Sequence, residues 1–344
     1  MKKTLLVTLD YYPNVGGIAN YWKRLSDCLP AESFLVYVPK LSRIVFPRWL
    51  PLFFRVYSII KKEKIEHVIV GQILPIGTVV WILSKVMQIR YSVSTHGMDI
   101  APERLSSRKI FLCKKILAGA EFVICNSEYT ASLVKRYGQI AHIEIVYPCP
   151  SIIPSDHATI QNQNHTLLTV ARLVRRKGHE DVLRALTGLV KEFPDLSYVI
   201  IGDGPERQFL ENLARQLQLD TRVRFVGHAS DEEVAEWYTR TSVVIMTPTR
   251  EGGDVEGFGI TYLEANAFGK PVIASRTGGV GEAVVDGETG ILVKPGDSQA
   301  IHDAIRCLLN DRVLAERLGN TGRMRVQQDF NWREQARKLE QALH

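Results

Sequence analysis

The chain has 344 residues, 45% of them hydrophobic and 23% charged, with a formal net charge of +6. These values are typical of a soluble globular protein, and the length predicts two domains. The charge is uneven, because residues 1–150 carry 20 Lys and Arg against 10 Asp and Glu, whereas residues 151–344 carry 23 against 27. The basic first half is expected to meet an anionic partner. No nucleic-acid-binding motif accompanies it, so a phosphorylated acceptor or an anionic membrane fits better than nucleic acid.

The cysteines and the N-terminus bear on the cellular compartment. The five cysteines are scattered and form no C-x-x-C pair: Cys28, Cys113, Cys125, Cys149 and Cys307. Disulfide frameworks and zinc sites need even or close pairing, so reduced, buried thiols in a cytosolic protein are expected. The apolar run in MKKTLLVTLDYYP is too short for a signal peptide and predicts a first strand.

In the first half, short apolar runs alternate with helical stretches. Helices are expected at Ile18–Leu29, around Thr78–Met87 and from about Tyr129 onward. The apolar runs are continuous and β-branched, as in parallel strands that are buried on both faces. They are TLLVTL, FLVYV, VIVG, YSVSTHG, FVICNS and IEIVYP.

The segment Lys40–Lys64 interleaves large apolar residues with seven Lys or Arg. It is too charged to span a bilayer, but an interfacial helix has this pattern. A helix that packs an apolar stripe on the sheet and exposes its cations has it too. The sequence leaves both interpretations open.

Residues 151–165 are polar and without periodicity, which predicts a linker, and the strand–helix rhythm then returns. Strands are expected in HTLLTVARL, SYVIIG, VRFVG, VVIMTP, PVIAS and GILVKP. Helices are expected at Glu180–Glu192, Glu206–Leu217, Asp231–Arg240 and Gln299–Leu309, with Ser230 and Asp297 near two of their starts. The predicted fold is α/β, with two Rossmann-like, doubly wound domains (1–150 and 166–328) facing a central cleft.

The stretch EGGDVEGFGITYLE at residues 251–264 contains the residues best suited to binding a ligand. It follows the strand VVIMTP, so it should lie at the carboxyl edge of the sheet, where ligands bind. Gly257 and Gly259 allow close approach to a ligand, and the N-terminus of the next helix suits a diphosphate. Glu256 in the loop and Glu264 in the helix could hold a sugar and a ribose on either side of the phosphates.

A second basic motif, ARLVRRKGHED, supplies cations. Arg172 and Lys177 flank the turn between a strand and a helix, and both could reach a diphosphate. Together they could stabilise a departing nucleoside diphosphate without a metal, and no D-x-D motif is present.

At these residues the sequence resembles the retaining GT-B glycosyltransferases of family 4. The likeness includes ARLVRRKGHED, VIIGDGPE, VRFVGH, EGFGITYLEANAFGKPVIAS, TGGVGE and DGETGILV, and in the first half Gly16-Gly17, THGMD and CNSEYT. The family's two glutamates fall on Glu256 and Glu264. The longer TREGGDVEGFG loop is similar to that of mannosyltransferases acting on phosphatidylinositol-type acceptors.

The resemblance implies a role for each matching residue. Arg172 and Lys177 would hold the diphosphate, Glu264 the ribose and Glu256 the hydroxyls of the donor sugar. The backbone around Gly227 and His228 would meet the base, and that of Gly257, Phe258 and Gly259 would offer N–H groups. In the first domain, Gly17 would approach the phosphates or the sugar, and His96 would lie beside the transferred sugar. The last helix, 329–344, would cross back to the first domain.

Several roles stay open in the sequence. His96 is also explained as a structural core histidine, and Asp99 or Asp10 could polarise an acceptor hydroxyl. The leaving phosphate itself can take the acceptor proton in this family. YPCPS at residues 147–151 departs from the family pattern, and residues 31–90 contain almost no family motif, so the hinge contacts and the acceptor are not fixed.

The expected activity is the transfer of a hexose, of mannose or glucose type, from a nucleotide sugar with retention. The acceptor would be lipid-linked, phosphorylated or a saccharide, with no cofactor or metal required. The expected location is cytoplasmic, with peripheral contact at the inner membrane face. The alternatives are an inactive sugar-nucleotide-binding subunit and a nucleotide-sugar 2-epimerase.

Overall fold

The structure is a computed structural model that describes residues 1–13, 16–39, 49–155 and 165–344. It divides into two compact units, one of residues 1–148 with 331–344 and the other of residues 149–330. Residues 151–155 of the expected linker belong to the second unit, and residues 156–164 lie outside the described residues.

The five cysteines were expected to be buried. Cys113, Cys125 and Cys149 are buried, but Cys28 and Cys307 are exposed, so the expectation was wrong for these two.

The first unit is built on a parallel sheet that has six strands in the described residues, in the order β2-β1-β3-β4-β5-β6. The strands are β1 (Thr4–Val7), β2 (Phe34–Tyr37), β3 (His67–Val70), β4 (Arg90–Thr95), β5 (Val123–Cys125) and β6 (Ile143–Ile145). The helices are α1 (Gly17–Asp27), α2 (Leu50–Glu63), α3 (Ile76–Met87), α4 (Ser107–Ala118), α5 (Glu128–Lys135) and α13 (Trp332–Ala342). All six expected strands are present.

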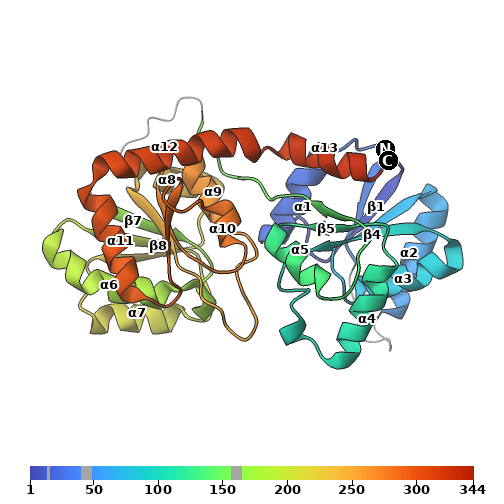
Figure 1. Cartoon of the computed structure of the whole chain (residues 1–344), viewed down its shortest axis with the longest axis horizontal. Coiled ribbons are helices and arrows are strands. Elements are labelled where there is room, and N and C mark those ends of the chain that lie inside the picture. The colour runs from blue at the N-terminus through green and yellow to red at the C-terminus, as the bar shows by residue number, and fades with distance from the viewer. Residues whose placement is uncertain (14–15, 40–48, 156–164) are drawn as a thin grey trace. The chain divides into compact units, whose positions relative to one another are not determined.

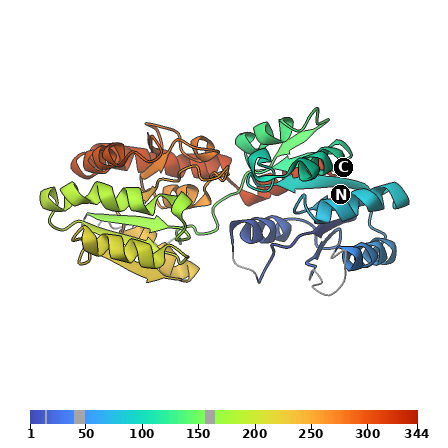
Figure 2. The same ribbon diagram turned by 90° about the horizontal axis from the view of Figure 1, so that it is seen from below.

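Successive residues of each strand point to opposite faces of the sheet, and helices cover both faces. Leu5 and Val7 pack in a core with α2, α3, α4 and α5, whereas Leu6 packs with α1 and α13. Figures 1 and 2 show these helices on the two sides of the sheet. The continuous apolar runs of the sequence reflect this burial on both faces.

The second unit repeats this plan, with the strand order β12-β11-β10-β7-β8-β9. Its strands are β7 (Thr166–Val170), β8 (Ser197–Ile201), β9 (Val223–Gly227), β10 (Val243–Met246), β11 (Val272–Ser275) and β12 (Gly290–Val293). Its helices are α6 (His179–Glu192), α7 (Arg207–Gln216), α8 (Asp231–Arg240), α9 (Ile260–Ala267), α10 (Val280–Ala283), α11 (Ser298–Asn310) and α12 (Arg312–Asp329). Both units are Rossmann-like α/β domains, as expected.

Helix starts in the second unit follow the expected capping. Ser230 begins α8 with a complete capping box, in which its side chain accepts from Glu233 N and the Glu233 side chain accepts from Ser230 N. Asp297 begins α11 by accepting from Ala300 N. These bonds satisfy N–H groups that the first turn of a helix leaves free.

Helix α2 lies in the segment Lys40–Lys64, for which two interpretations were open. Leu52, Val56 and Ile60 form a buried stripe in the core of the first unit, as in the packing interpretation. Phe54 and Tyr57 are nevertheless exposed, at 63% and 38%. Residues 40–48 of this segment lie outside the described residues.

Candidate functional site

The second unit carries a loop and a helix start at the carboxyl end of β10, where the glycine-rich stretch was expected. The loop closes on itself through two hydrogen bonds between the backbones of Glu251 and Asp254. Helix α9 then begins after Gly259, which has no side chain with which to cap the first turn. The N–H groups of that turn therefore have the character of an anion site.

A second turn, between β7 and α6, lies against this loop. It passes through a 3-10 helix at Arg175–Lys177 and ends at Gly178, which has a φ of +75°. A Cβ at Gly178 would lie 2.0 Å from the carbonyl oxygen of Thr247, so only glycine fits there. This close approach brings Arg176 and Lys177 beside the loop after β10.

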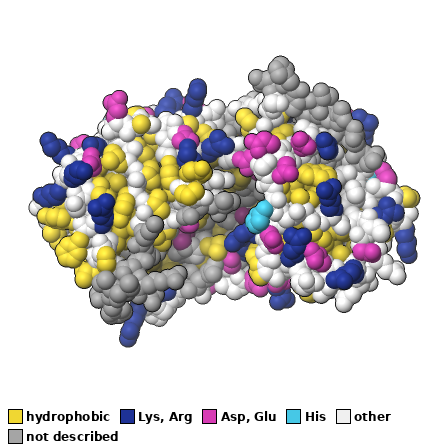
Figure 3. Space-filling model, turned by 180° about the vertical axis from the view of Figure 1, so that it is seen from behind, with side chains coloured by type: hydrophobic (Ala, Val, Ile, Leu, Met, Phe, Trp, Pro, Cys, Tyr) yellow, Lys and Arg dark blue, Asp and Glu magenta, His cyan; other side chains and the backbone are white. Residues whose placement is uncertain are grey.

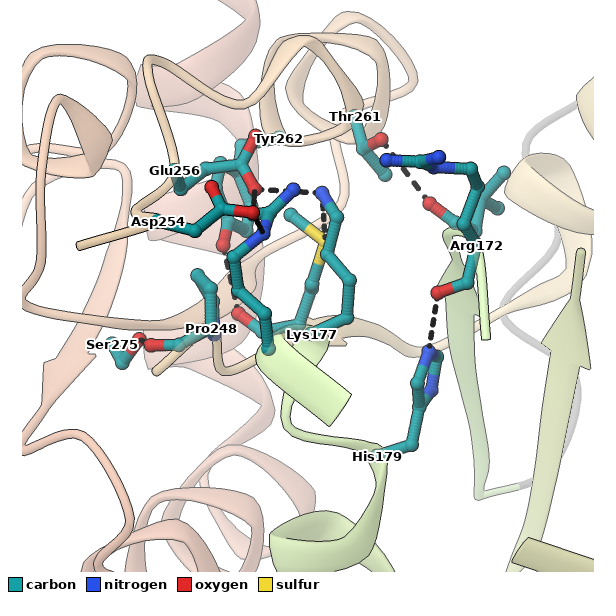
Figure 4. A network of polar contacts seen from close by, with 12 residues as sticks. Arg172, Lys177, His179, Pro248, Asp254, Glu256, Thr261, Tyr262 and Ser275 are labelled. Atoms are coloured by element: carbon teal, nitrogen blue, oxygen red, sulfur yellow. Dashed lines mark hydrogen bonds and ion pairs between the residues drawn. The ribbon is translucent and has the colours of Figure 1, made fainter. Parts of the chain in front are cut away.

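Glu256 is the centre of a buried charge cluster (Figure 4). Its Oε2 accepts from Arg176 Nη1 at 2.6 Å and from Lys177 Nζ at 2.7 Å. Burial raises the pKa of this carboxyl, but Lys177 and Arg176 outweigh that effect and hold the pKa at about 2. Glu256 is therefore ionised at neutral pH, at the place where the sequence expected a donor-binding carboxylate.

Arg176 and Asp254 complete the cluster, and neither was singled out in the sequence. Arg176 Nε lies 3.3 Å from Asp254 Oδ2, and the Arg176 side chain is only 8% exposed. A run of three basic residues at 175–177 gives no sign of which one turns inward. The contacts with Asp254 and Glu256 show that Arg176 is the one that turns inward.

Arg172 lies apart from this cluster. Its side chain is exposed and extends toward Thr261, in the first turn of α9 (Figure 4). Thr261 Oγ1 donates to the carbonyl oxygen of Val170, so the end of β7 is tied to the start of α9. The carbonyl oxygen of Arg172 lies 3.1 Å from Nε2 of His179. Burial lowers the pKa of His179 to about 4, so this ring is neutral and donates from Nε2.

Glu264 is buried in α9, at 6% exposure. Its Oε1 accepts from Ser151 N at 3.3 Å, and its Oε2 accepts from Tyr238 Oη at 3.3 Å. Burial raises the pKa of Glu264 to about 7, although these hydrogen bonds act in the opposite direction. The expected ribose ligand thus already has protein partners, and Tyr238 was not found by sequence reasoning.

The remaining donor-site candidates of the second unit lie at strand ends and in the α9 loop. Gly227 ends β9 with a φ of +84°, and its carbonyl oxygen accepts from Gly202 N; His228 after it is exposed. Phe258 as a whole is 2% exposed and its ring packs on Phe330, so its side chain has a structural role. Gly257 and Gly259 are not in the charge cluster.

In the first unit, the candidates lie at the carboxyl ends of strands. Gly17 begins α1, and a Cβ there would meet no described atom within 4 Å. His96 follows β4, with Nε2 3.1 Å from Ser94 Oγ and the ring edge-on to Tyr21. Burial lowers the pKa of His96 to about 4, so the ring is neutral at pH 7.

Asp99 and Asp10, the two other candidate carboxylates of the first unit, both accept hydrogen bonds within the protein. Asp99 Oδ1 accepts from His96 N at 2.9 Å and so shapes the turn that carries the histidine. Burial raises the pKa of Asp99 to about 6. Asp10 Oδ2 accepts from Gln72 Nε2 at 3.0 Å.

The described residues contain neither a cluster of metal ligands nor a helix that could span a membrane. Among those residues, no three or more His, Cys, Asp or Glu side chains come together as metal ligands would. None of the helices in the described ranges combines the length and the hydropathy that crossing a bilayer requires.

Two family models match the chain. The model described as "Glycosyl transferases group 1" matches residues 155–325, and "Glycosyltransferase Family 4" matches residues 15–149. A GDP-mannose-dependent alpha-(1-6)-phosphatidylinositol monomannoside mannosyltransferase of Mycolicibacterium smegmatis is 30% identical over 98% of this chain and 97% of its own. The monoacylated-substrate counterpart of Corynebacterium glutamicum is 26% identical over 99% and 98%.

Solved structures share the whole fold. Sucrose-phosphate synthase from Thermosynechococcus elongatus superposes with a TM-score of 0.84 at 23% identity, over 100% of this chain and 98% of that one. Anabaena HepE in complex with UDP and glucose gives a TM-score of 0.83 at 20% identity, over 100% and 99%.

Proposed function

The chain belongs to glycosyltransferase family 4 and is a glycosyltransferase, and from this we propose that it transfers mannose from GDP-mannose to a phosphatidylinositol-type glycolipid. The donor and acceptor classes rest on the end-to-end similarity to mannosyltransferases that are named for them. The proposed donor site rests on one observation, the cluster of Arg176, Lys177 and Glu256 beside the start of α9.

The charges of this cluster suit a departing diphosphate. Lys177 Nζ and the first-turn N–H groups of α9 offer positive charge, and Arg172 extends toward the same turn (Figure 4). Stabilising the leaving group in this way requires no metal, and we propose that none is used and that no cofactor is required. Glu256 would bind hydroxyls of the mannose, and Glu264 would bind the ribose.

The proposed reaction retains the configuration at the anomeric carbon. The bond from that carbon to the diphosphate oxygen breaks, and a bond to the acceptor hydroxyl oxygen forms on the same face. The departing phosphate oxygen takes the hydroxyl proton, so the chemistry needs no protein base. His96, neutral at pH 7, is then a positioning group for the sugar rather than a general acid.

The first test measures GDP release and mannose incorporation with GDP-mannose, UDP-glucose and ADP-glucose as donors. The acceptor is vesicles containing phosphatidylinositol monomannoside. We expect turnover with GDP-mannose alone, unchanged by EDTA, and an α-linked product by NMR. Lys177→Met should abolish turnover, whereas Lys191→Met, on the exposed face of α6, should not. Turnover with another donor, or loss of activity in EDTA, would overturn the corresponding part of the proposal.

We also propose that the first unit lies against an anionic membrane. Helix α4 exposes Arg108, Lys109, Lys114 and Lys115 around Phe111, which is 62% exposed. Arg108 and Lys109 lie in the first turn, where cations oppose the helix dipole, so helix stability does not explain them. Figure 3 shows Lys and Arg interspersed with hydrophobic side chains on one face of this unit.

Vesicle co-sedimentation tests this contact. Lys114→Gln with Lys115→Gln should weaken binding to vesicles rich in phosphatidylserine by about thirtyfold, since each cation near the surface contributes ~1 kcal/mol. The matched pair Lys191→Gln with Lys294→Gln, exposed on the second unit, should bind as the parent does. Equal binding by both double variants, or by vesicles of phosphatidylcholine alone, would contradict an anionic membrane contact through α4.

A further inference from the structure

Arg176 fixes both ends of the loop that carries Glu256. Its carbonyl oxygen accepts from Thr249 N at 2.7 Å, where the loop leaves β10. Its guanidinium reaches Asp254 Oδ2 at 3.3 Å and Glu256 Oε2 at 2.6 Å, where the loop approaches α9. One buried side chain and its own backbone therefore determine where the loop begins and ends.

Glu256 shares a single oxygen between two cations. Arg176 and Lys177 both donate to Oε2, and Oε1 accepts no hydrogen bond in the described part of the chain. Lys177 Nζ also lies 3.5 Å from Met246 Sδ, a weak partner for an ammonium group. The Lys177 contact is thus the one that a diphosphate could replace at least cost.

We propose that Arg176 is a positioning residue that holds Glu256 in place when Lys177 turns from Glu256 to the donor diphosphate. This inference rests on the proposed function, because it needs a nucleotide-sugar donor at the site. The carboxylate then keeps a charged partner through Oε2, and Oε1 stays available for the hydroxyls of the donor sugar.

The charges of the site explain why such a holder is needed. A diphosphate near Lys177 places negative charge close to the Glu256 carboxylate, and the two repel each other. The Glu256 side chain is only 13% exposed, and a carboxylate in such a place with no cation beside it would turn away or take up a proton. Arg176 prevents both, and Asp254 keeps the guanidinium in position from its other edge.

The geometry also requires arginine rather than lysine. The guanidinium presents several N–H groups in one plane, so it can bond Asp254 and Glu256 together. A lysine ammonium at this position would keep the charge but lose that fixed, two-sided contact. Arg176→Lys therefore keeps the charge but changes the geometry, so the two contributions can be measured separately.

The experiment is calorimetric titration of GDP and of GDP-mannose into the parent and into Arg176→Lys, Arg176→Gln and Asp254→Asn. We expect GDP to bind all four within about threefold. GDP-mannose should bind Arg176→Gln about tenfold more weakly than the parent, the usual cost of a lost hydrogen bond to a charged group. Arg176→Lys and Asp254→Asn should show smaller losses in the same direction. Arg175→Gln, at an exposed neighbouring residue, should match the parent.

The outcomes distinguish this inference from the proposed function. If GDP and GDP-mannose weaken equally, Arg176 binds the diphosphate itself and the inference is wrong. It is also wrong if Arg176→Gln binds GDP-mannose as the parent does. If the parent binds neither ligand, the proposed donor fails and the inference fails with it. Asp254→Asn changes a single partner without removing the buried cation, so it supplies the test if Arg176→Gln does not fold.

Discussion

The ion pairs around Glu256 are expected to contribute measurably to the free energy of unfolding of the second unit. The pKa of Glu256 falls from 4.5 to about 2 because of Lys177 and Arg176. A difference of about 2.5 in pKa, at ~1.4 kcal/mol for each pKa unit, corresponds to about 3.5 kcal/mol at pH 7. Glu256→Gln should therefore lower the free energy of unfolding by about that amount, since Lys177 loses its anion and Arg176 keeps only Asp254.

The pH dependence of this loss has a definite sign. The folded pKa is lower than the unfolded one, so the stabilisation is complete above the unfolded pKa and is lost as the pH falls toward about 2. The difference between parent and variant should shrink to about 1.5 kcal/mol at pH 3. Both measurements are needed, because a packing defect alone would not depend on pH.

The assay must report on the second unit alone. Met246 is a buried residue of β10 beside Lys177, so its oxidation by peroxide at rising urea concentration follows unfolding there. The matched control is Glu251→Gln, in the same loop but exposed, with an expected change below about 0.5 kcal/mol. Equal losses in both variants, or a Glu256→Gln loss that is the same at pH 3 and pH 7, would refute the ion-pair reasoning.

Three further predictions concern other residues of the second unit. Burial raises the pKa of Glu264 to about 7, so the stability of the parent should fall as the pH rises from about 4.5 to 7. Urea titrations of Glu264→Gln should lack this fall, and a parallel fall in parent and variant would contradict the raised pKa. Gly278→Ala should weaken GDP-mannose binding at least tenfold, because Gly278 has a φ of +55° and a Cβ there would lie 2.1 Å from the carbonyl oxygen of Glu256. Gly281→Ala is the control and should bind GDP-mannose as the parent does, since a Cβ there meets open space. Ser230→Ala should cost about 1 kcal/mol in the same unfolding assay through loss of the α8 cap, and an unchanged midpoint would show that this cap contributes nothing.

The fold could be predicted well where burial leaves a pattern. Parallel strands buried on both faces give continuous apolar runs, and all twelve expected strands are present among the described residues. Helix α4 was not expected, because four exposed cations hide its few buried positions, such as Cys113 and Ile116. Helix α12 was missed because it packs partly through Gly319 and Gly322, which carry no hydrophobic signal.

The site could be predicted as far as local chain order determines it. A loop after a strand and a glycine before a helix place Glu256 and the start of α9 at one edge of the sheet. The partners of Glu256 could not be read in this way. Arg176 turns inward because a 3-10 turn and Gly178 set its direction and because Asp254, far along the chain, receives it. Tyr238 meets Glu264 through the packing of α8 beside α9, which no local pattern specifies.

The first unit is assembled from two separate pieces of the chain, and this affects how the protein is made. Residues 331–344 supply α13, whose Ala336 and Leu339 pack with Tyr21, Trp22 and Leu25 of α1. During synthesis the ribosome produces the whole second unit before α13 emerges. The second unit can therefore finish folding first, while the apolar side of α1 stays exposed until α13 packs on it. A chain that stopped before residue 331 would keep that surface exposed and would be a substrate for chaperones or aggregation.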